Sequence, residues 1–329
     1  MRLLVLGGTH FLGRHVVAAG LARGHEVATF TRGRSGRAPE GVRDLHGDRE
    51  VAGDLGAALG EWRPELVVDC SCQSRAAATQ AAETLAGPAG ADLRGYAFVS
   101  SINAYAGWPP GPVGSDDDPT WPEDTVLEGA EDYGPTKAWA ERRLTAALDV
   151  PVLLARAGLI CGPYDPLERL GWWLRRIGAG GRVVVPETLD QPMAIVDARD
   201  LADWLVRGAE QGWRGGVNAT GPSDLITLGG LLETCVRVTG ADVELVPLPE
   251  ATLLEAGVEP WTHLPFWLPA DVAATAWQVA TPRARETGLV TRTVEQTVSD
   301  VWDWLRAEQP PARPGAGLPA ELEARLLAG

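Results

Sequence analysis

The chain has 329 residues, of which 45% are hydrophobic and 22% are charged, and its formal net charge is −15. This composition is typical of a folded globular protein with one or two domains. A surface with so large a negative charge repels phosphate backbones, so we do not expect nucleic acid to be the main partner.

No pattern in the chain is typical of export, of a membrane span or of a bound metal. The start, MRLLVLGGTH, breaks into glycines after a few apolar residues, and no apolar run approaches the roughly 20 residues that cross a bilayer. Cys70 and Cys72 flank one serine, and no histidine pair follows at metal-ligand spacing. With Cys161 and Cys235 they are expected to be buried, reduced thiols. We therefore expect a cytoplasmic protein without a metal site or membrane contact.

The first 30 residues predict a strand, a glycine-rich turn, a helix and a second strand. LLVL at 3–6 is a continuous apolar run, GGTHFLG follows at 7–13, and residues 14–24 have apolar positions at helical spacing. Such a turn brings backbone N–H groups and a helix N-terminus against a pyrophosphate, which predicts a dinucleotide site. The residues expected to hold the dinucleotide are Gly7, Gly8, Thr9, His10, Phe11, Leu12 and Gly13.

Strands and helices continue to alternate, which predicts an α/β fold with a doubly wound parallel sheet, the Rossmann architecture. Beyond about residue 165, tryptophans, prolines and irregular stretches indicate a smaller C-terminal substrate lobe, with short strands at 217–222 and 243–249. The expected division is 1–164 for the dinucleotide-binding domain, with 192–217 returning to it, 165–191 and 218–306 for the substrate lobe, and 307–329 for a linker and terminal helix. The predicted strands are 25–30, 65–71, 96–101 and 150–156, and the predicted helices are 75–86, one beginning near Tyr133, and the terminal one.

Lys137 is the only lysine of the chain, and it stands four residues after Tyr133. A helix places both on one face, and Pro135 between them is tolerated if it lies in the first turn. A free tyrosine, with a pKa of about 10, is a poor base at neutral pH, but a nearby ammonium and a positively charged nicotinamide favour the phenolate. Tyr133 is therefore predicted to exchange a proton with the substrate while hydride moves, and Lys137 to bind the cofactor ribose.

Four segments, in this order, resemble the extended short-chain dehydrogenase/reductase superfamily, whose members are NAD(P)-dependent and epimerase/dehydratase-like. They are GGTHFLG, FVSSINAYAG, YGPTK with Glu141 after it, and RAGLICGP at 156–163. The resemblance is good over residues 1–220 and loose beyond. It implies that Ser101, not Ser100, is the catalytic hydroxyl that bonds the substrate oxygen beside Tyr133 and Lys137. It also implies a homodimer through the helices that flank the sheet.

His10 stands where the usual turn of this superfamily has its middle glycine. In this feature the chain is most similar to atypical branches, which include reductases of uncertain substrate and the chloroplast stem-loop RNA-binding proteins. Two interpretations of His10 stay open: a side chain that points to solvent, and one that lies against the pyrophosphate.

The end of the second strand favours NADP over NAD. NAD enzymes place an acid there for the ribose 2′-hydroxyl, whereas an arginine accommodates the 2′-phosphate of NADP. Here Thr31 stands at the acidic position, and Arg32 and Arg34 follow. Asp48 resembles the residue that, in members of this superfamily, caps the adenine ring of the cofactor.

The substrate is predicted to be a small molecule other than a nucleotide sugar. Nucleotide-sugar members of the superfamily carry an asparagine where this chain has Leu159, and a diphosphate-binding arginine where Met193 or its neighbours stand. A diphosphate pocket would need that charge. Asn103 and Trp108, after the strand that ends at Ser101, are candidate substrate-pocket residues.

The favoured function is an NADP-dependent oxidoreductase that moves hydride to or from a small carbonyl or alcohol. One alternative is a sugar epimerase or dehydratase that keeps its cofactor bound and uses it transiently. Another is a non-catalytic binder, RNA included, on the same scaffold, against which the net charge of −15 counts.

Overall fold

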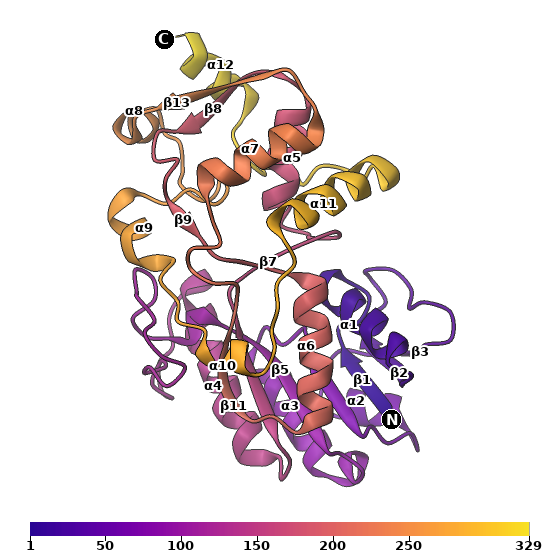
Figure 1. Ribbon diagram of the computed structural model, residues 1–329. Coiled ribbons are helices and arrows are strands. Elements are labelled where there is room, and N and C mark those ends of the chain that lie inside the picture. Colours follow the sequence, from indigo (N-terminus) through magenta and orange to yellow (C-terminus); the bar gives the residue numbers. More distant parts are fainter. Residues whose placement is uncertain (329) are drawn as a thin grey trace.

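A computed structural model describes residues 1–328 and shows one seven-stranded parallel sheet in the order β11-β6-β5-β4-β1-β2-β3 (Figure 1). The central strands β1, β4, β5 and β6 are buried almost throughout, as their continuous apolar runs predict. The strands of this sheet are β1 (Arg2–Leu6), β2 (Glu26–Thr31), β3 (Arg43–His46), β4 (Leu66–Asp69), β5 (Gly95–Ser101), β6 (Val152–Ala157) and β11 (Gly215–Ala219).

Helices cover both faces of the sheet and bury two separate apolar layers. On one face α1 (Phe11–Ala22) packs against α6 (Ala198–Gln211), which also contacts β4, β5 and β6. On the other face lie α2 (Asp54–Leu59), α3 (Arg75–Ala86) and α4 (Tyr133–Ala147). The predicted doubly wound Rossmann architecture is therefore confirmed.

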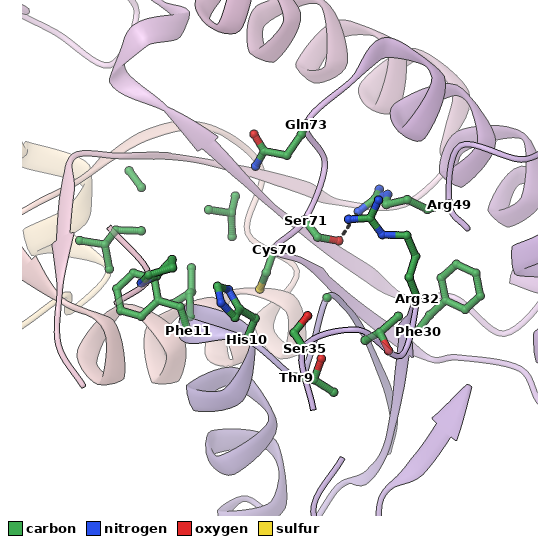
Figure 2. A pocket seen from close by; sticks show the side chains of 18 of the residues that line it. Thr9, His10, Phe11, Phe30, Arg32, Ser35, Arg49, Cys70, Ser71 and Gln73 are labelled. Atoms are coloured by element: carbon green, nitrogen blue, oxygen red, sulfur yellow. Dashed lines mark hydrogen bonds between the residues drawn. The ribbon is translucent and has the colours of Figure 1, made fainter. Parts of the chain in front are cut away.

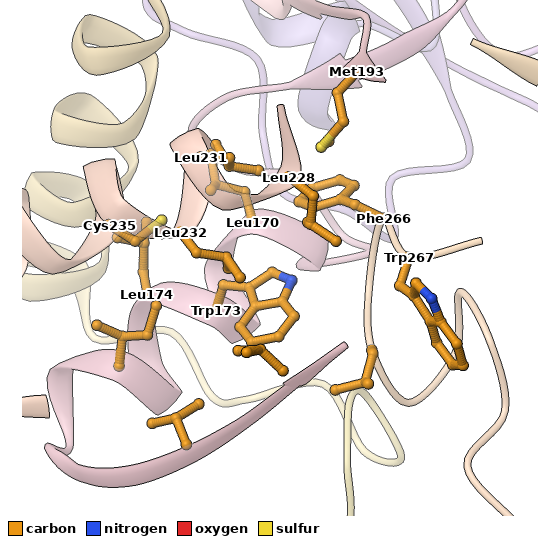
Figure 3. Close-up of a cluster of buried hydrophobic side chains, with 14 of the residues drawn as sticks. Leu170, Trp173, Leu174, Met193, Leu228, Leu231, Leu232, Cys235, Phe266 and Trp267 are labelled. Atoms are coloured by element: carbon orange, nitrogen blue, oxygen red, sulfur yellow. The ribbon is translucent and has the colours of Figure 1, made fainter. Parts of the chain in front are cut away.

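A second lobe lies beyond the carboxyl ends of the strands (Figure 1). Its core contains Trp173, Leu174, Leu232 and Phe266, all fully buried (Figure 3). Most tryptophans beyond residue 165 lie in this core or pack against it, namely Trp172, Trp173, Trp261, Trp267, Trp277, Trp302 and Trp304. The elements of the lobe are α5 (Arg169–Gly178), β8 (Gly181–Pro186), β9 (Pro192–Met193), β12 (Ile226–Thr227), α7 (Leu228–Thr239), β13 (Val243–Leu248), α8 (Glu250–Glu255), α9 (Ala270–Ala276), α11 (Val294–Glu308) and α12 (Ala320–Ala328).

The chain passes between the two lobes several times, and this corrects details of the expected division. The segment predicted as a lobe strand at 217–222 contains the end of β11, which pairs with β6 in the main sheet. Residues 195–197 form β10 (Ile195–Asp197), which pairs only with β7 (Leu159–Cys161), outside that sheet. The short helix α10 (Pro282–Glu286) packs on β11, and Leu322 of the terminal helix joins the core of the second lobe.

Within residues 1–328, no helix is long and apolar enough to cross a membrane. All four cysteines are free thiols, as predicted; three are buried, and Cys70 is half-buried.

Candidate active site

The glycine-rich turn between β1 and α1 forms a tight cradle. Gly7 has φ +90°, a conformation that favours glycine, and a Cβ there would lie 2.5 Å from the Ser71 Cβ. A Cβ on Gly13 would lie 1.9 Å from the Gly7 carbonyl oxygen. No side chain fits at either position, so α1 begins directly against the turn. This is the close approach that a pyrophosphate site needs.

The turn opens into a cleft of about 500 Å³ at the carboxyl ends of the strands, which we call the main cleft. Figure 2 shows its side chains, with Arg32, Arg49 and Phe30 toward one end and His10 and Phe11 toward the other. The residues that line the main cleft include Gly7, Thr9, His10, Phe11, Leu12, Gly13, Arg32, Arg34, Asp48, Arg49, Ser71, Ser101, Tyr133, Lys137, Pro166 and Leu167. Nearly all the residues predicted from the sequence thus come together here, although Gly8, Asn103 and Trp108 are not among those that line the cleft.

Tyr133 is the first residue of α4, and Pro135 is in its first turn. The Tyr133 side chain is 38% exposed, and its hydroxyl makes no hydrogen bond within residues 1–328. The Lys137 Nζ lies 5.6 Å from the centroid of the Tyr133 ring. The helix therefore presents a free hydroxyl to the main cleft, with an ammonium close to the same ring.

Lys137 is 2% exposed, and its ammonium sits between two strand ends. The Nζ donates to the Cys72 carbonyl at 2.7 Å and to the Val99 carbonyl at 3.0 Å. An ammonium has three donors, so one remains for a ligand in the main cleft. Two carbonyls that accept from one buried point charge explain physically why this position holds a lysine.

Ser101 is the last residue of β5, and Asn103 orients its hydroxyl. The Ser101 Oγ donates to Asn103 Oδ1 at 2.9 Å and accepts from the Asn103 backbone N–H at 3.2 Å. The neighbouring Ser100 Oγ instead donates to Glu141 at 2.6 Å. Ser101 lines the main cleft together with Ser100, but only Ser100 is tied to a buried carboxylate. Asn103 acts on the serine and does not face the cleft.

Sequence reasoning missed a buried polar network behind these serines. Glu141 receives two hydrogen bonds on one oxygen and two on the other, from Ser100 and from the Arg156 guanidinium. Arg156 also donates to the Tyr105 hydroxyl at 2.9 Å, and that hydroxyl donates to Asn218 at 2.6 Å. This network joins α4, β5, β6 and β11 at the floor of the site. Its only sequence signal was Glu141, noted beside YGPTK.

The end of β2 carries cations without partners. Arg32 and Arg34 are exposed, line the main cleft, and form no salt bridge within residues 1–328. Thr31 stands at the position of the acid, and its hydroxyl accepts a hydrogen bond from the Gly33 N–H at 3.2 Å. Asp48 lines the same end of the cleft.

Arg49, beside Asp48, was not predicted as a site residue. It donates to both oxygens of Asp69, at 2.5 and 2.7 Å, and to Ser71 at 2.8 Å. Burial opposes ionisation of Asp69, but the charge and hydrogen bonds of Arg49 lower the pKa of this carboxyl below its usual value. Arg49 thereby fixes the loops after β3 and β4 on either side of the cleft.

Trp108 does not line the main cleft, contrary to the prediction, whereas Leu159 and Met193 are the apolar residues that the prediction against a diphosphate requires. Trp108 packs on Val113 and Val279, and its indole N–H donates to the Ala276 carbonyl at 2.7 Å, away from the main cleft. Met193 is fully buried in the lobe core, and Leu159 packs against it. Neither of these two apolar side chains carries a positive charge or a hydrogen-bond donor that could bind a diphosphate.

His10 is exposed and also lines the main cleft. Burial, and then the nearby Arg14, lower the pKa of its imidazole below the usual value. The His10 side chain is thus exposed to solvent and also borders the main cleft, and both interpretations of its role stay open.

A family model described as "NAD dependent epimerase/dehydratase family" matches residues 3–219, about two thirds of the chain. The chain belongs to this family. Membership accounts for the glycine turn, the sheet and the position of α4, and it confirms the superfamily resemblance stated from the motifs.

Curated relatives of this family member have mixed descriptions. One is the Arabidopsis thaliana chloroplast stem-loop binding protein of 41 kDa b, 26% identical over 257 residues, which is 73% of this chain and 63% of that protein. Another is a Streptomyces 3-diazoavenalumate denitrifying reductase, 32% identical over 205 residues, 57% of this chain and 65% of that protein. The chain thus matches less than two thirds of the length of these relatives.

Solved structures with the same fold include nucleotide-sugar epimerases. The Bordetella bronchiseptica enzyme WbmH in complex with NAD⁺ has a TM-score of 0.71 at 14% identity, covering 93% of this chain and 98% of that one. The Thermus thermophilus UDP-glucose 4-epimerase with NAD has a TM-score of 0.67 at 19% identity, covering 93% of this chain and 99% of that one. Identities this low establish the shared fold alone.

Proposed function

We propose that this protein is an NADP-dependent oxidoreductase that transfers hydride to or from a small, non-nucleotide carbonyl or alcohol. The observation that carries the proposal is the main cleft, where the glycine turn, Ser101, Tyr133 and Lys137 line one cavity. Reduction of a carbonyl would consume one NADPH and one proton and yield the alcohol and NADP⁺, so electrons and atoms balance.

The residues of the cleft fit such a cofactor. The turn has no space for a side chain at Gly7 or Gly13, so its backbone N–H groups can lie directly against a pyrophosphate. The third donor of Lys137 suits ribose hydroxyls, and Arg32 and Arg34 suit a 2′-phosphate. When bound, the nicotinamide supplies or accepts the hydride.

The residues of the chain then handle the proton and the developing charge. The Ser101 hydroxyl, whose proton goes to Asn103 Oδ1 without substrate, turns to donate that proton to the substrate oxygen when substrate binds. Tyr133 gives its proton to that oxygen in the reduction direction and takes it back in oxidation. Lys137 holds the ribose and places positive charge near the tyrosine ring. The Glu141–Arg156 pair keeps the floor of the site rigid.

The proposal is tested with purified protein, NADPH and a panel of aldehydes and ketones, followed by the loss of NADPH absorbance. Saturable consumption that requires Tyr133 supports it. A protein that copurifies with tightly bound cofactor and interconverts sugars without net redox change would instead be an epimerase or dehydratase, the activity named for several structural neighbours. Tight RNA binding without turnover would favour the activity suggested by the name of the Arabidopsis relative.

We expect NADP(H) to bind at least tenfold more tightly than NAD(H), because Arg32 forms no salt bridge within residues 1–328 and position 31 holds a threonine rather than an acid. Tenfold corresponds to about 1.4 kcal/mol, modest for a charge-assisted phosphate contact. Fluorescence titration of both cofactors measures the ratio. Arg32→Gln should abolish the preference, whereas Arg37→Gln, in the same loop but outside the lining of the cleft, should leave it unchanged. Equal affinities for the two cofactors in the wild-type protein would refute this prediction.

We expect millimolar UDP or dTDP not to compete with the substrate, because Leu159 and the buried Met193 cannot bind a diphosphate. Steady-state inhibition with each diphosphate tests this. A crystal grown with UDP-glucose that contains an ordered diphosphate in the second lobe would show that the prediction is wrong.

A further inference from the structure

The charged side chains that line the main cleft, apart from Lys137, stand in the loops that follow β2 and β3. Within residues 1–328 they are Arg32, Arg34, Asp48, Arg49 and Glu50. β2 and β3 form one edge of the sheet, whereas β4, β5 and β6 lie on the other side of β1. Charge in the lining is therefore concentrated at the end of the cleft that we propose for the 2′-phosphate.

The wall beside Ser101 and Tyr133 comes from β5, α4 and the loops after β4, β6 and β7. Of the described residues that line this wall, only Lys137 is charged, and its ammonium already donates to two backbone carbonyls. In the adjoining glycine turn, burial and the nearby Arg14 lower the pKa of the His10 imidazole, which favours its neutral form. The reaction end of the cleft thus has no free cation for an anionic substrate.

Leu167 gives this wall an apolar surface. It is 38% exposed and lines the main cleft, as Pro166 and Ile160 also do. The Leu167 backbone N–H donates to the Asp165 carboxylate at 2.9 Å, which fixes the loop in this position. Ligand sites typically combine such apolar walls with a few polar groups that orient the ligand.

Gln73 is a polar group on the same wall, in the loop after β4. Its side chain is exposed, lines the main cleft and makes no hydrogen bond within residues 1–328. The loop starts with Ser71 against Gly7 of the glycine turn, and its next carbonyl, that of Cys72, accepts from the Lys137 Nζ at 2.7 Å. The loop therefore passes the lysine before it reaches Gln73, which places Gln73 on the substrate side of the proposed ribose site.

We propose that the substrate is an uncharged carbonyl compound whose apolar body lies on Leu167 and Pro166 and whose second polar group is bound by the Gln73 amide. This inference rests on the proposed function of the main cleft and names its substrate class. An anion would lose hydration at this wall without gaining a cation, because Arg32 and Arg49 lie well away from Gln73 (Figure 2). The amide both donates and accepts, so it suits a hydroxyl or a second carbonyl.

Matched ketones test the charge and the polar contact separately. 4-Acetylbenzamide and 4-acetylbenzoate differ in charge. 2-Hydroxyacetophenone with propiophenone, and 3-hydroxyacetophenone with 3-methylacetophenone, differ by a hydroxyl in place of a methyl group. Calorimetry with the protein–NADP⁺ complex measures binding without turnover, and NADPH consumption measures kcat/KM.

We expect the amide to bind at least about tenfold more tightly than the acid, because the acid must lose the hydration of its charge. At least one hydroxy ketone should bind about 3- to 10-fold more tightly than its methyl partner, the range for one neutral hydrogen bond. The values of kcat/KM should follow the same order.

Gln73→Met keeps the length of the side chain and removes its donor and its acceptor. It should lower the preferred hydroxy ketone to the level of its methyl partner, affect the methyl ketones less, and keep the affinity for NADP⁺. Gln211→Met is the matched control and should retain the full preference, because Gln211 is exposed at the end of α6 and does not line the cleft. Leu167→Asn should weaken every aromatic ketone by about threefold or more. Circular dichroism should show every variant folded.

The proposal is overturned if the acid binds as well as the amide, if neither hydroxy ketone is preferred, or if Gln73→Met keeps the preference. It is also overturned if Gln73→Met weakens NADP⁺ and all ketones alike, because Gln73 would then bind the cofactor. Turnover of ketones without these preferences would leave the oxidoreductase standing without this substrate class. Gln73-dependent binding of a hydroxy ketone without NADPH consumption by any ketone would support the pocket and remove the proposed redox function.

Discussion

Tyr133→Phe is expected to lower turnover by about 10² to 10⁴ while cofactor affinity largely persists. The change removes only a hydroxyl, and that hydroxyl makes no hydrogen bond within residues 1–328 that its loss could disrupt. Stability should therefore stay near that of the wild type, and the loss should fall on kcat. Steady-state kinetics with the best carbonyl of the panel, together with a cofactor titration, give both quantities.

Tyr164→Phe is the control for this change, because it also removes one hydroxyl. The Tyr164 hydroxyl donates to Glu308 at 2.6 Å and does not line the main cleft. Turnover should stay within a few fold of wild type. If Tyr133→Phe were as active as Tyr164→Phe, Tyr133 would not be the proton-transfer group.

Lys137→Arg is expected to lose nearly as much activity as Tyr133→Phe, although the positive charge is kept. Lys137 is 2% exposed, and its compact ammonium donates to the Cys72 and Val99 carbonyls at once. The planar guanidinium of an arginine in this enclosed position cannot keep both hydrogen bonds to the carbonyls and still offer a donor to the ribose. Cofactor affinity should fall as well, which separates this variant from Tyr133→Phe. Fluorescence titration and steady-state kinetics measure the two effects.

The double variant should cost little more than Tyr133→Phe alone, because residues that act as one unit are not additive. Wild-type turnover in Lys137→Arg would mean that the lone lysine has no role beyond its charge. The thermal midpoint of each variant distinguishes lost chemistry from lost folding.

The Rossmann domain was predictable because its strands are buried on both faces. β1, β4, β5 and β6 then appear as apolar runs, and the turn at Gly7 requires glycine by its φ. Many residues that line the main cleft follow from the same rule, since they stand in the loops after the parallel strands or at the start of α4, although Arg49 was missed. Local sequence pattern was enough to predict a site residue wherever that residue directly follows a strand.

Long-range pairing was not predictable in this way. β11 reads GGVNA, with glycines and no apolar run, and it is a sheet strand only because β6 lies beside it. Arg156 and Tyr105 are 51 residues apart, and their contact depends on how the loop after β5 folds back. Trp108 was misplaced for the same reason, because its partner Ala276 is 168 residues away.

The repeated passage of the chain between the lobes limits how this protein could be recombined with relatives. A single crossover near residue 165 would bring a foreign α6 against the native α1, and a foreign β11 against the native β6. It would also bring in a foreign Asn218, which accepts from the native Tyr105 across the join. A lobe that exchanges specificity must instead be transplanted as three stretches, α5–β9, β12–α9 and α11–α12, with the intervening segments left native. New substrate ranges in this scaffold should therefore come more readily from point changes around the main cleft than from shuffling of segments.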